Sequence, residues 1–502
     1  MTAQPSRSRV LLVDLNNFSR YPTQSVGYLA AVLRRAGWHV EVFSPFSTGV
    51  SGVVREPPVR PWHLAMERLG YRSAMSRSPL VRQLRSGLAG LMAPQLARAT
   101  RRVLRSFLEQ LDAGSGFDAV LISSYLMYFP LCRGMAAACA ERGIPLLIGS
   151  AGFTQPGVVQ EWASLHGVTA LAAGELELEI PEILDAMVAG RDLGGFPGIL
   201  VSEQGTLRGR MAPPRRKLDE VPFPDFSDFP WERYPNRIVP MITGRGCGWG
   251  VCTFCSDVVT AAGRTYRSRS PQAVLDELRH QAARYRAGLF AFTDLKLNSD
   301  LDVWHALIEH FQEVVPGARW IGAVHIGKKL PNGLSRDELV AARQAGMVRL
   351  TTGLESGSQR LLDAMKKGTD LALTSACLRH AREAGISVRT TMIIGYPGET
   401  AEDLVQTRDF LRAHRDCIER VVLNRFQIMT GTLFHRQMEE RAERFPGLAK
   451  VEPNHRMAQM EHHYAPAVSR QYRRAINEVL VEVHAINRRP IMAVARDFEG
   501  VM

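Results

Sequence analysis

Short apolar runs alternate with helical stretches along most of the chain, and this rhythm restricts it to α/β folds built on parallel sheets. In the first block, residues 10–13 (Val-Leu-Leu-Val) suit a buried strand, and the apolar residues of 26–33 recur at helical spacing. Further strands are expected at 40–43, 119–122, 146–148 and 169–173. Each crossover helix returns the chain to the same end of the sheet. We therefore predict a doubly wound, Rossmann-like domain over residues 1–200.

The same alternation restarts after a proline-rich stretch. Strands are expected at 238–243, 289–292, 320–324, 348–353, 388–394 and 421–427. Six strand–helix pairs over residues 236–440 fit a partial parallel barrel, whose chemistry gathers on the loops after the strands. Residues 201–235 read as an extended connector. Residues 441–502 are expected to form a helical cap, since one apolar stripe runs along residues 472–486.

Charge and hydropathy narrow the possible partners. The chain has 62 Lys and Arg against 50 Asp and Glu, but only seven of the basic residues are lysines. Arginine is spread throughout, with one local excess in an insertion at about 47–112 that we interpret as a solvated helical face. A nucleic-acid partner is therefore not expected. The apolar run 119–132 is shorter than the ~20 residues of a membrane span, and no signal peptide is recognisable, so a cytoplasmic location is expected.

Three of the seven cysteines lie together in a glycine-rich loop that directly follows the first strand of the second block. They are Cys247, Cys252 and Cys255. In a reducing compartment, clustered cysteines favour metal ligation over disulfides. Structural zinc sites and closed iron–sulfur clusters normally take four protein ligands. Three ligands on a four-iron cluster would leave one iron open to a small molecule.

This loop resembles the signature of the radical S-adenosylmethionine (SAM) enzymes, and later segments match that family in order. They are Thr352-Gly-Leu-Glu-Ser-Gly-Ser358 and Ile393-Ile-Gly-Tyr-Pro-Gly-Glu-Thr400. One departure is that four residues separate the first two cysteines, where the family usually has three. The resemblance implies a [4Fe–4S] cluster on Cys247, Cys252 and Cys255. It also implies SAM contacts from Phe254, Asp294, Glu355, Ser356 and Gly395.

The doubly wound domain resembles the cobalamin-binding class of these enzymes. The segments that match include residues 10–14, 24–42, 120–125, 147–150 and 174–175. The resemblance implies a cobalamin site on the loops after the strands, with Asn16, Ser123, Ser124, Gly149, Ser150 and Gly174 as its residues. The Asp-x-His-x-x-Gly motif that supplies a histidine to cobalt is absent, so cobalamin would be bound without a protein imidazole.

The resemblance implies a methyltransferase that methylates an unactivated carbon of a small molecule through a 5′-deoxyadenosyl radical and methylcobalamin. An external one-electron reductant would be needed. No catalytic residue is singled out, although His325 and Lys296 at strand ends are candidates for polar contacts. A cobalamin-dependent cyclase or oxidase without methyl transfer remains an alternative. A methylthiotransferase is discounted, because only Cys132 and Cys139 precede the barrel. A zinc-stabilised nucleic-acid-binding protein would require a fourth ligand near the loop.

Overall fold

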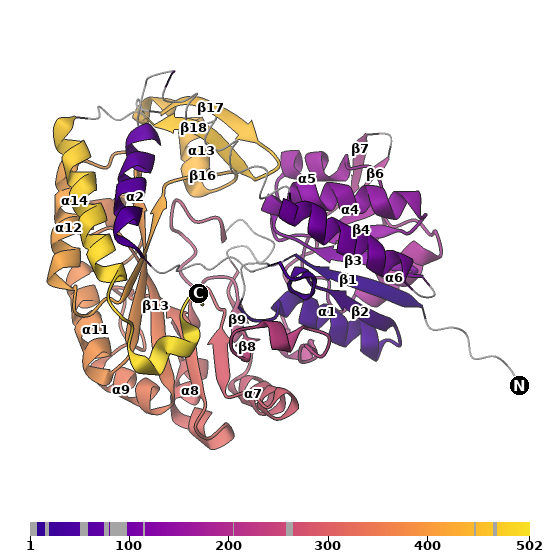
Figure 1. The fold of residues 1–502 in the computed structure, drawn as a ribbon, viewed down its shortest axis with the longest axis horizontal. Coiled ribbons are helices and arrows are strands. Elements are labelled where there is room, and N and C mark those ends of the chain that lie inside the picture. The colour runs from indigo at the N-terminus through magenta and orange to yellow at the C-terminus, as the bar shows by residue number, and fades with distance from the viewer. Residues whose placement is uncertain are drawn as a thin grey trace, which may run out of the picture.

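The computed structural model describes residues 8–15, 20–50, 59–74, 80, 98–113, 116–203, 205–257, 265–445, 448–464 and 469–501. Two α/β bodies lie side by side in it, the first domain and a larger barrel (Figure 1). Among the described residues, no helix has the length and apolarity that crossing a bilayer requires.

The first domain is built on a seven-stranded sheet in the order β2-β1-β3-β4-β5-β6-β7. Its parallel strands are β1 (Arg9–Asp14), β2 (His39–Phe43), β3 (Ala119–Ser123), β4 (Leu146–Gly149) and β5 (Ala170–Ala172). Helices α1 (Gln24–Arg35) and α6 (Ile180–Val188) pack on one face. Helices α4 (Phe129–Glu141), α5 (Pro156–Ala163) and the helix at 98–112 pack on the other. The predicted doubly wound sheet is confirmed.

Alternate residues of β1 enter opposite cores, which explains why the strand is apolar throughout. Val10 and Leu12 face α1 and α6, whereas Leu11 and Val13 face α4 and α5. The sheet also continues into the segment that we predicted as a connector. There, β6 (Ile199–Glu203) and β7 (Thr206–Gly209) add an antiparallel hairpin. The short spacing between these two strands allows only a tight turn, which forces antiparallel pairing.

The barrel is a six-stranded parallel sheet in the order β15-β14-β13-β12-β11-β8, as predicted. Its strands are β8 (Ile238–Met241), β11 (Leu289–Phe292), β12 (Arg319–Val324), β13 (Met347–Glu355), β14 (Ser387–Ile394) and β15 (Arg420–Arg425). The helices around it are α7 (Pro271–Tyr285), α8 (Leu301–Val314), α9 (Arg336–Gln344), α10 (Gln359–Ala364), α11 (Leu371–Ala384) and α12 (Ala401–Ala413). A small antiparallel pair, β9 (Gly244–Arg245) and β10 (Arg267–Ser268), closes the base of the cysteine loop.

The C-terminal region is mixed, which corrects the expectation of a purely helical cap. Helix α14 (Arg470–Asn487) buries the predicted stripe against α12. Before it come β16 (Ile428–Met429), α13 (Leu433–Glu440), β17 (Leu448–Asn454) and β18 (Gln459–Tyr464), whose three strands form a separate sheet. The turn between β17 and β18 places Ala458 in the left-handed region at φ 52°. Alanine gives no turn signal in a sequence, so the hairpin was not predicted.

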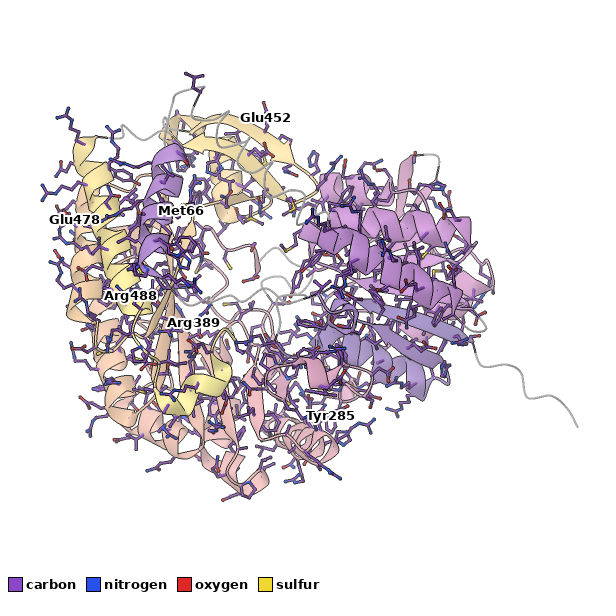
Figure 2. All side chains as sticks on the ribbon, in the orientation of Figure 1. Met66, Tyr285, Arg389, Glu452, Glu478 and Arg488 are labelled. Atoms are coloured by element: carbon purple, nitrogen blue, oxygen red, sulfur yellow. The ribbon has the colours of Figure 1, made fainter. Side chains whose placement is uncertain are left out.

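The arginine-rich insertion spans both bodies instead of forming only a solvated face. Its helix α2 (Pro61–Ala74) crosses to the barrel and lies beside α14 (Figure 1), where His484 Nε2 donates to the carbonyl of Arg60 at 3.2 Å. Met66 is exposed on α2 (Figure 2). The helix at 98–112 instead buries Val103 and Phe107 in the first domain. Amphipathic helices with long arginine side chains can pack one face while their charges stay in water.

The connector lies along the barrel and holds the two bodies together. Tyr285, at the end of α7 (Figure 2), accepts from the Phe226 amide at 2.7 Å and donates to Asp225 at 3.1 Å. Short 3-10 turns occur at η1 (Pro45–Thr48), η2 (Leu126–Tyr128), η3 (Leu218–Glu220), η4 (Trp231–Arg233), η6 (Leu297–Ser299), η7 (Ala442–Arg444) and η8 (Ala493–Phe498).

Candidate functional site

The carboxyl ends of the two parallel sheets face each other. Thr293, after β11 of the barrel, donates from Oγ1 to Gln24 Oε1 at the start of α1, at 3.0 Å. Glu175, after β5 of the first domain, pairs with Arg245 of β9 at 3.2 Å. Ligands of parallel α/β sheets bind outside the carboxyl ends of the strands. A ligand bound to the first-domain sheet and a ligand bound to the barrel would therefore lie next to each other.

The cysteine loop is tied to the loop that follows α10. Trp249 Nε1 donates to the Lys366 carbonyl at 2.8 Å, and the Thr253 amide donates to Met365 at 3.0 Å. Trp249 also lies so close to Gly368 that a Cβ there would meet its ring at 2.3 Å. The four residues between the first two cysteines thus include one large side chain that anchors the loop. Gly250, at φ 57°, supplies the left-handed turn that follows.

The three thiols share one electrostatic environment. Burial raises the pKa of Cys252 to about 11, and the charge of Cys247 acts in the same direction. The charge of Lys367 opposes this shift, and it acts on Cys255 as well. Among the described residues, no group of three or more His, Cys, Asp or Glu could hold a single metal ion. A four-iron cluster does not need such a group, because each thiolate binds a different iron. Three thiolates are one fewer than a structural zinc site takes, and they match a four-iron cluster with one open iron.

A buried ion pair lies beside the loop, and its lysine was not predicted. Lys367 Nζ lies 2.8 Å from Glu355 Oε1 and 6.0 Å from the ring centroid of Phe254. The side chains of Lys367 and Glu355 are only 11% and 7% exposed. Burial works to lower the pKa of Lys367, but the charge and hydrogen bond of Glu355 together with the charges of Cys252 and Cys255 outweigh it, and the pKa is raised. No local motif surrounds this lysine, so only the fold brings it to the cysteines.

Three other predicted SAM residues also lie at strand ends. Asp294, after β11, accepts from the Thr243 and Gly244 amides at 3.0 Å and so holds the start of the cysteine loop. Burial raises the pKa of Asp294 to about 6. Ser356, after β13, is buried and its hydroxyl lies 3.2 Å from Thr407 Oγ1. Gly395, after β14, adopts φ 82° and donates to Glu399 at 2.9 Å.

His325 is held at the end of β12, close to the cysteine loop. The Asn298 side chain accepts from the His325 amide at 3.0 Å and donates to the His325 carbonyl at 3.1 Å. The His325 ring stacks on Trp249 with a centroid distance of 6.1 Å. Its Nε2 is buried and has no hydrogen-bond partner among the described residues. Burial, Lys367 and Lys296 lower the pKa of His325 to about 3, so the imidazole is neutral. It can therefore donate to, or accept from, a ligand at neutral pH.

Among the predicted first-domain residues, Ser123 and Gly149 end β3 and β4, and Ser124, Ser150 and Gly174 lie on the loops after β3, β4 and β5. Asn16 lies outside the described residues. Ser123 Oγ is 3.1 Å from Ser25 Oγ, Ser124 Oγ donates to the Tyr125 carbonyl at 2.9 Å, and Ser150 Oγ accepts from the Gly152 amide at 3.2 Å. The predicted site contains two glycines. Gly149 ends β4, and Gly174 adopts φ 141° close to Ala212.

Two large side chains after β3 are exposed at this end of the sheet. Tyr125 is 53% and Met127 46% exposed. Ligand sites combine apolar and aromatic side chains with a few polar groups, and Tyr125 and Met127 lie next to the predicted serines of the cobalamin site. Apolar and hydrogen-bonding side chains therefore lie together where the cobalamin site is predicted.

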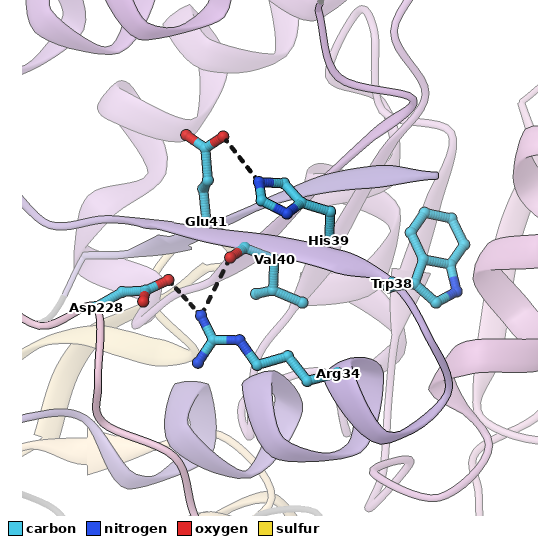
Figure 3. A pocket seen from close by; sticks show the side chains of 6 residues that line it. All are labelled: Arg34, Trp38, His39, Val40, Glu41 and Asp228. Atoms are coloured by element: carbon cyan, nitrogen blue, oxygen red, sulfur yellow. Dashed lines mark hydrogen bonds and ion pairs between the residues drawn. The ribbon is translucent and has the colours of Figure 1, made fainter. Parts of the chain in front are cut away.

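A hollow lies beside β2, the edge strand of the first-domain sheet (Figure 3). Arg34 donates to the Val40 carbonyl at 3.1 Å and pairs with Asp228, while His39 lies 3.5 Å from Glu41. Its charged side chains are thus paired with one another. The hollow joins the first domain to the connector and is not part of the candidate site.

Glu399 carries a testable pH dependence. It is buried, accepts from the Tyr472 hydroxyl at 2.7 Å, and burial raises its pKa from 4.5 to about 7. The folded state therefore keeps a proton that the unfolded state loses, so stability is full below pH 4.5 and declines as pH rises to 7. The shift corresponds to about 3 kcal/mol. We expect Glu399→Gln to lack this decline.

Thermal unfolding of the apoprotein at pH 5 and pH 8 measures the effect. Relative to wild type, Glu399→Gln should be more stable at pH 8 than at pH 5. Exposed Glu402 provides the matched control, Glu402→Gln, whose profile should follow wild type. Equal pH profiles for wild type and Glu399→Gln would show that this carboxyl is ionised throughout.

Comparison with known proteins gives three findings. Residues 241–411 match the radical SAM superfamily. An uncharacterised methyltransferase of Pyrococcus horikoshii is 27% identical over 255 residues, which cover 49% of this chain and 53% of that protein. The cytidylyl-2-hydroxyethylphosphonate methyltransferase of Streptomyces wedmorensis is 30% identical over 213 residues, 39% of each chain. The chain thus spans about half or less of the length of these curated relatives.

A solved structure covers almost the whole chain. The radical SAM methyltransferase TsrM of Kitasatospora setae, with tryptophan substrate and a SAM analogue bound, superposes with a TM-score of 0.65 at 17% identity. The match covers 95% of this chain and 89% of TsrM, so the two share a fold. The cobalamin-dependent SAM radical enzyme OxsB matches with the same TM-score over 92% of this chain and 65% of OxsB. Residues 241–411 therefore match the radical SAM superfamily, and the chain as a whole shares the two-domain fold of TsrM and OxsB.

Proposed function

We propose that the chain is a cobalamin-dependent radical SAM methyltransferase that methylates an unactivated carbon of a small molecule. The observation that carries the proposal is the meeting of two carboxyl edges, one with three cysteines and the other with the crevice after β3, β4 and β5. The methyltransferase relatives and the TsrM fold support it. Because TsrM was solved with tryptophan as its substrate, an amino acid is a reasonable first class of substrate to test.

The residues divide between the expected groups. Cys247, Cys252 and Cys255 would hold the cluster; Phe254, Asp294, Glu355, Ser356 and Gly395 would line the SAM site; and the serines and glycines of the first domain would hold cobalamin. When bound, these groups would supply one-electron cleavage of SAM and delivery of a methyl group to carbon.

The chain's own side chains prepare this site in three ways. Trp249 packs against Gly368 and His325 and holds one side of the cysteine loop in place. Lys367 brings a fixed positive charge to the thiols and orients Glu355. Neutral His325 offers a hydrogen bond at the end of β12. Orientation and exclusion of water are the main contributions a protein makes to radical chemistry of this kind.

Two alternatives are less well supported. A methylthiotransferase would need further cluster cysteines in the first domain, but Cys132 and Cys139 are buried in α4, and burial raises the pKa of each to about 12. Zinc would need a fourth ligand near the loop. Asp257 is the nearby candidate, with its Oδ2 3.8 Å from Cys255 Sγ, but the described residues bring no three such donors together on one metal ion.

Anaerobic purification and reconstitution test the proposal. We expect about four iron atoms per chain, stoichiometric cobalamin, and both 5′-deoxyadenosine and S-adenosylhomocysteine after reduction with SAM and tryptophan or other candidate substrates. Iron without cobalamin uptake would overturn the assignment of the first domain. Deoxyadenosine without S-adenosylhomocysteine, across a panel of substrates that are consumed, would point to a cyclase or oxidase. Zinc without iron would overturn the proposal as a whole.

A further inference from the structure

Three glutamates that alternate with leucines directly follow β5, and the fold gives each of them an arginine from another segment. The glutamates are Glu175, Glu177 and Glu179 of the run Glu-Leu-Glu-Leu-Glu. Their partners are Arg215 of the connector, Arg245 of β9 and Arg267 of β10. We refer to these six residues as the Glu–Arg network.

Two of the arginines bind a glutamate through two hydrogen bonds, and the third contacts two glutamates. Arg267 donates from Nη1 and Nη2 to the two carboxylate oxygens of Glu175, at 2.7 and 2.9 Å. Arg245 Nη1 lies 2.8 Å from Glu177 and 3.2 Å from Glu175, so it bridges them. Arg215 binds Glu179 at 2.6 Å, and its amide donates to Glu175 at 3.0 Å.

The charges of the network are balanced, and all its side chains are largely buried except that of Glu179, which is 47% exposed. The side chains of Glu175, Arg267 and Arg245 are 7%, 9% and 13% exposed. Three carboxylates face three guanidinium groups, so the network as a whole is neutral. Burial alone would raise the pKa of Glu175, but the Arg267 and Arg245 contacts hold it below its ordinary value. Bidentate arginine–carboxylate pairs fix geometry more tightly than point contacts do.

The position of the network makes it more than a general interface contact. Glu175 adjoins Gly174 of the predicted cobalamin site, and Arg245 precedes Cys247 by two residues. Arg245 and Arg267 are register partners in the β9–β10 pair that closes the base of the cysteine loop. The Glu175 carboxylate therefore holds both β9 and β10 through their arginines. Glu175 itself follows β5, which ends beside the predicted cobalamin site.

Other contacts join the two bodies without involving this loop. Arg34 of α1 pairs with Asp225 at 2.7 Å and with Asp228, both in the connector (Figure 3). Phe226 packs against Gly27 and Tyr285. These contacts would keep the bodies together if the network were broken. Only the cysteine loop would lose its fixed position relative to the first domain.

We propose that the Glu–Arg network consists of positioning residues that set the distance and orientation of the cysteine loop relative to the first-domain crevice. The inference rests on the proposed function only for its consequence, the alignment of the cluster with cobalamin. The clamping of the loop itself is a property of the protein without cofactors.

Two measurements on the full-length protein test it. In apoprotein, hydrogen–deuterium exchange of peptides covering residues 244–257 should increase about tenfold or more in Glu175→Gln, as loss of hydrogen bonds to a charged group implies. Arg245→Lys, which keeps the charge, should remain closer to wild type. Asp228→Asn removes a charge at the distant hollow and should leave this exchange unchanged. If Glu175→Gln does not fold, Glu177→Gln takes its place.

In reconstituted protein, pulsed EPR measures the distance between cob(II)alamin and the reduced cluster. Wild type and Asp228→Asn should give one narrow distribution, and Glu175→Gln a broader or shifted one. Unchanged exchange in Glu175→Gln, or an equal increase in Asp228→Asn, would overturn the proposal. If wild type binds no cobalamin, the proposed function fails, and the exchange experiment still decides whether the network clamps the loop.

Discussion

The Cys255→Ala variant is expected to bind little or no iron–sulfur cluster and to produce no 5′-deoxyadenosine from SAM. Three thiols are the minimum that holds a four-iron cluster with one open iron, so no ligand can be spared. The remaining four cysteines cannot substitute, because Cys132, Cys139 and Cys377 are buried within helices and Cys417 lies beyond α12. The same loss is expected for Cys247→Ala and Cys252→Ala.

Iron content, the visible absorption of the reconstituted protein and EPR after reduction measure this loss. Cys417→Ala is the matched control, since Cys417 is also half-buried but isolated from the loop, and it should bind iron as wild type does. Full iron content and deoxyadenosine formation in Cys255→Ala would contradict the ligand assignment. Equal loss in Cys417→Ala would show that the method damages the protein.

Replacing Lys367 with methionine is expected to destabilise the barrel by about 3–5 kcal/mol, because it leaves the buried carboxylate of Glu355 without its partner. The two side chains lie 2.8 Å apart and are almost excluded from water. Gly353 leaves the room they need, since a Cβ there would meet Lys367 Nζ at 2.6 Å. Under the proposed function the variant should also bind SAM more weakly, because Glu355 is predicted to contact it.

Denaturant unfolding of the apoprotein measures the stability, and equilibrium dialysis of reconstituted protein measures SAM binding. Exposed Lys366 offers the matched control, Lys366→Met, which should change neither. The double variant Lys367→Met/Glu355→Gln should recover much of the stability, because it removes the uncompensated charge. A Lys367→Met protein as stable as the control would mean that Glu355 finds another partner or takes up a proton.

Much of the architecture could be predicted because its signals are local. The apolar run of β1, the helical spacing in α1 and the stripe on α14 each depend on neighbouring residues, and the structure contains all three. The prediction failed where the signal was weak or the partner distant. The β6–β7 hairpin lay within a proline-rich stretch, and the β17–β18 turn uses alanine at positive φ.

Long-range packing explains the other corrections. Helix α2 follows the first two strands of the first domain in sequence, but it packs beside α14 at the far end of the chain. Nothing in the composition of the insertion indicates that destination, because any amphipathic helix can pack on any apolar face of matching shape.

The sequence by itself determined the cysteine loop, the two blocks of alternating strands and helices, and the order of the strand-end segments, because each of these is written in residues close together along the chain. Only the tertiary structure decided that the two carboxyl edges face each other, that Lys367 pairs with Glu355 beside the thiols, and that Glu175 holds Arg245 and Arg267. The reason is physical: charge pairing and burial depend on distances in space between residues that the chain separates by 12 to 269 positions.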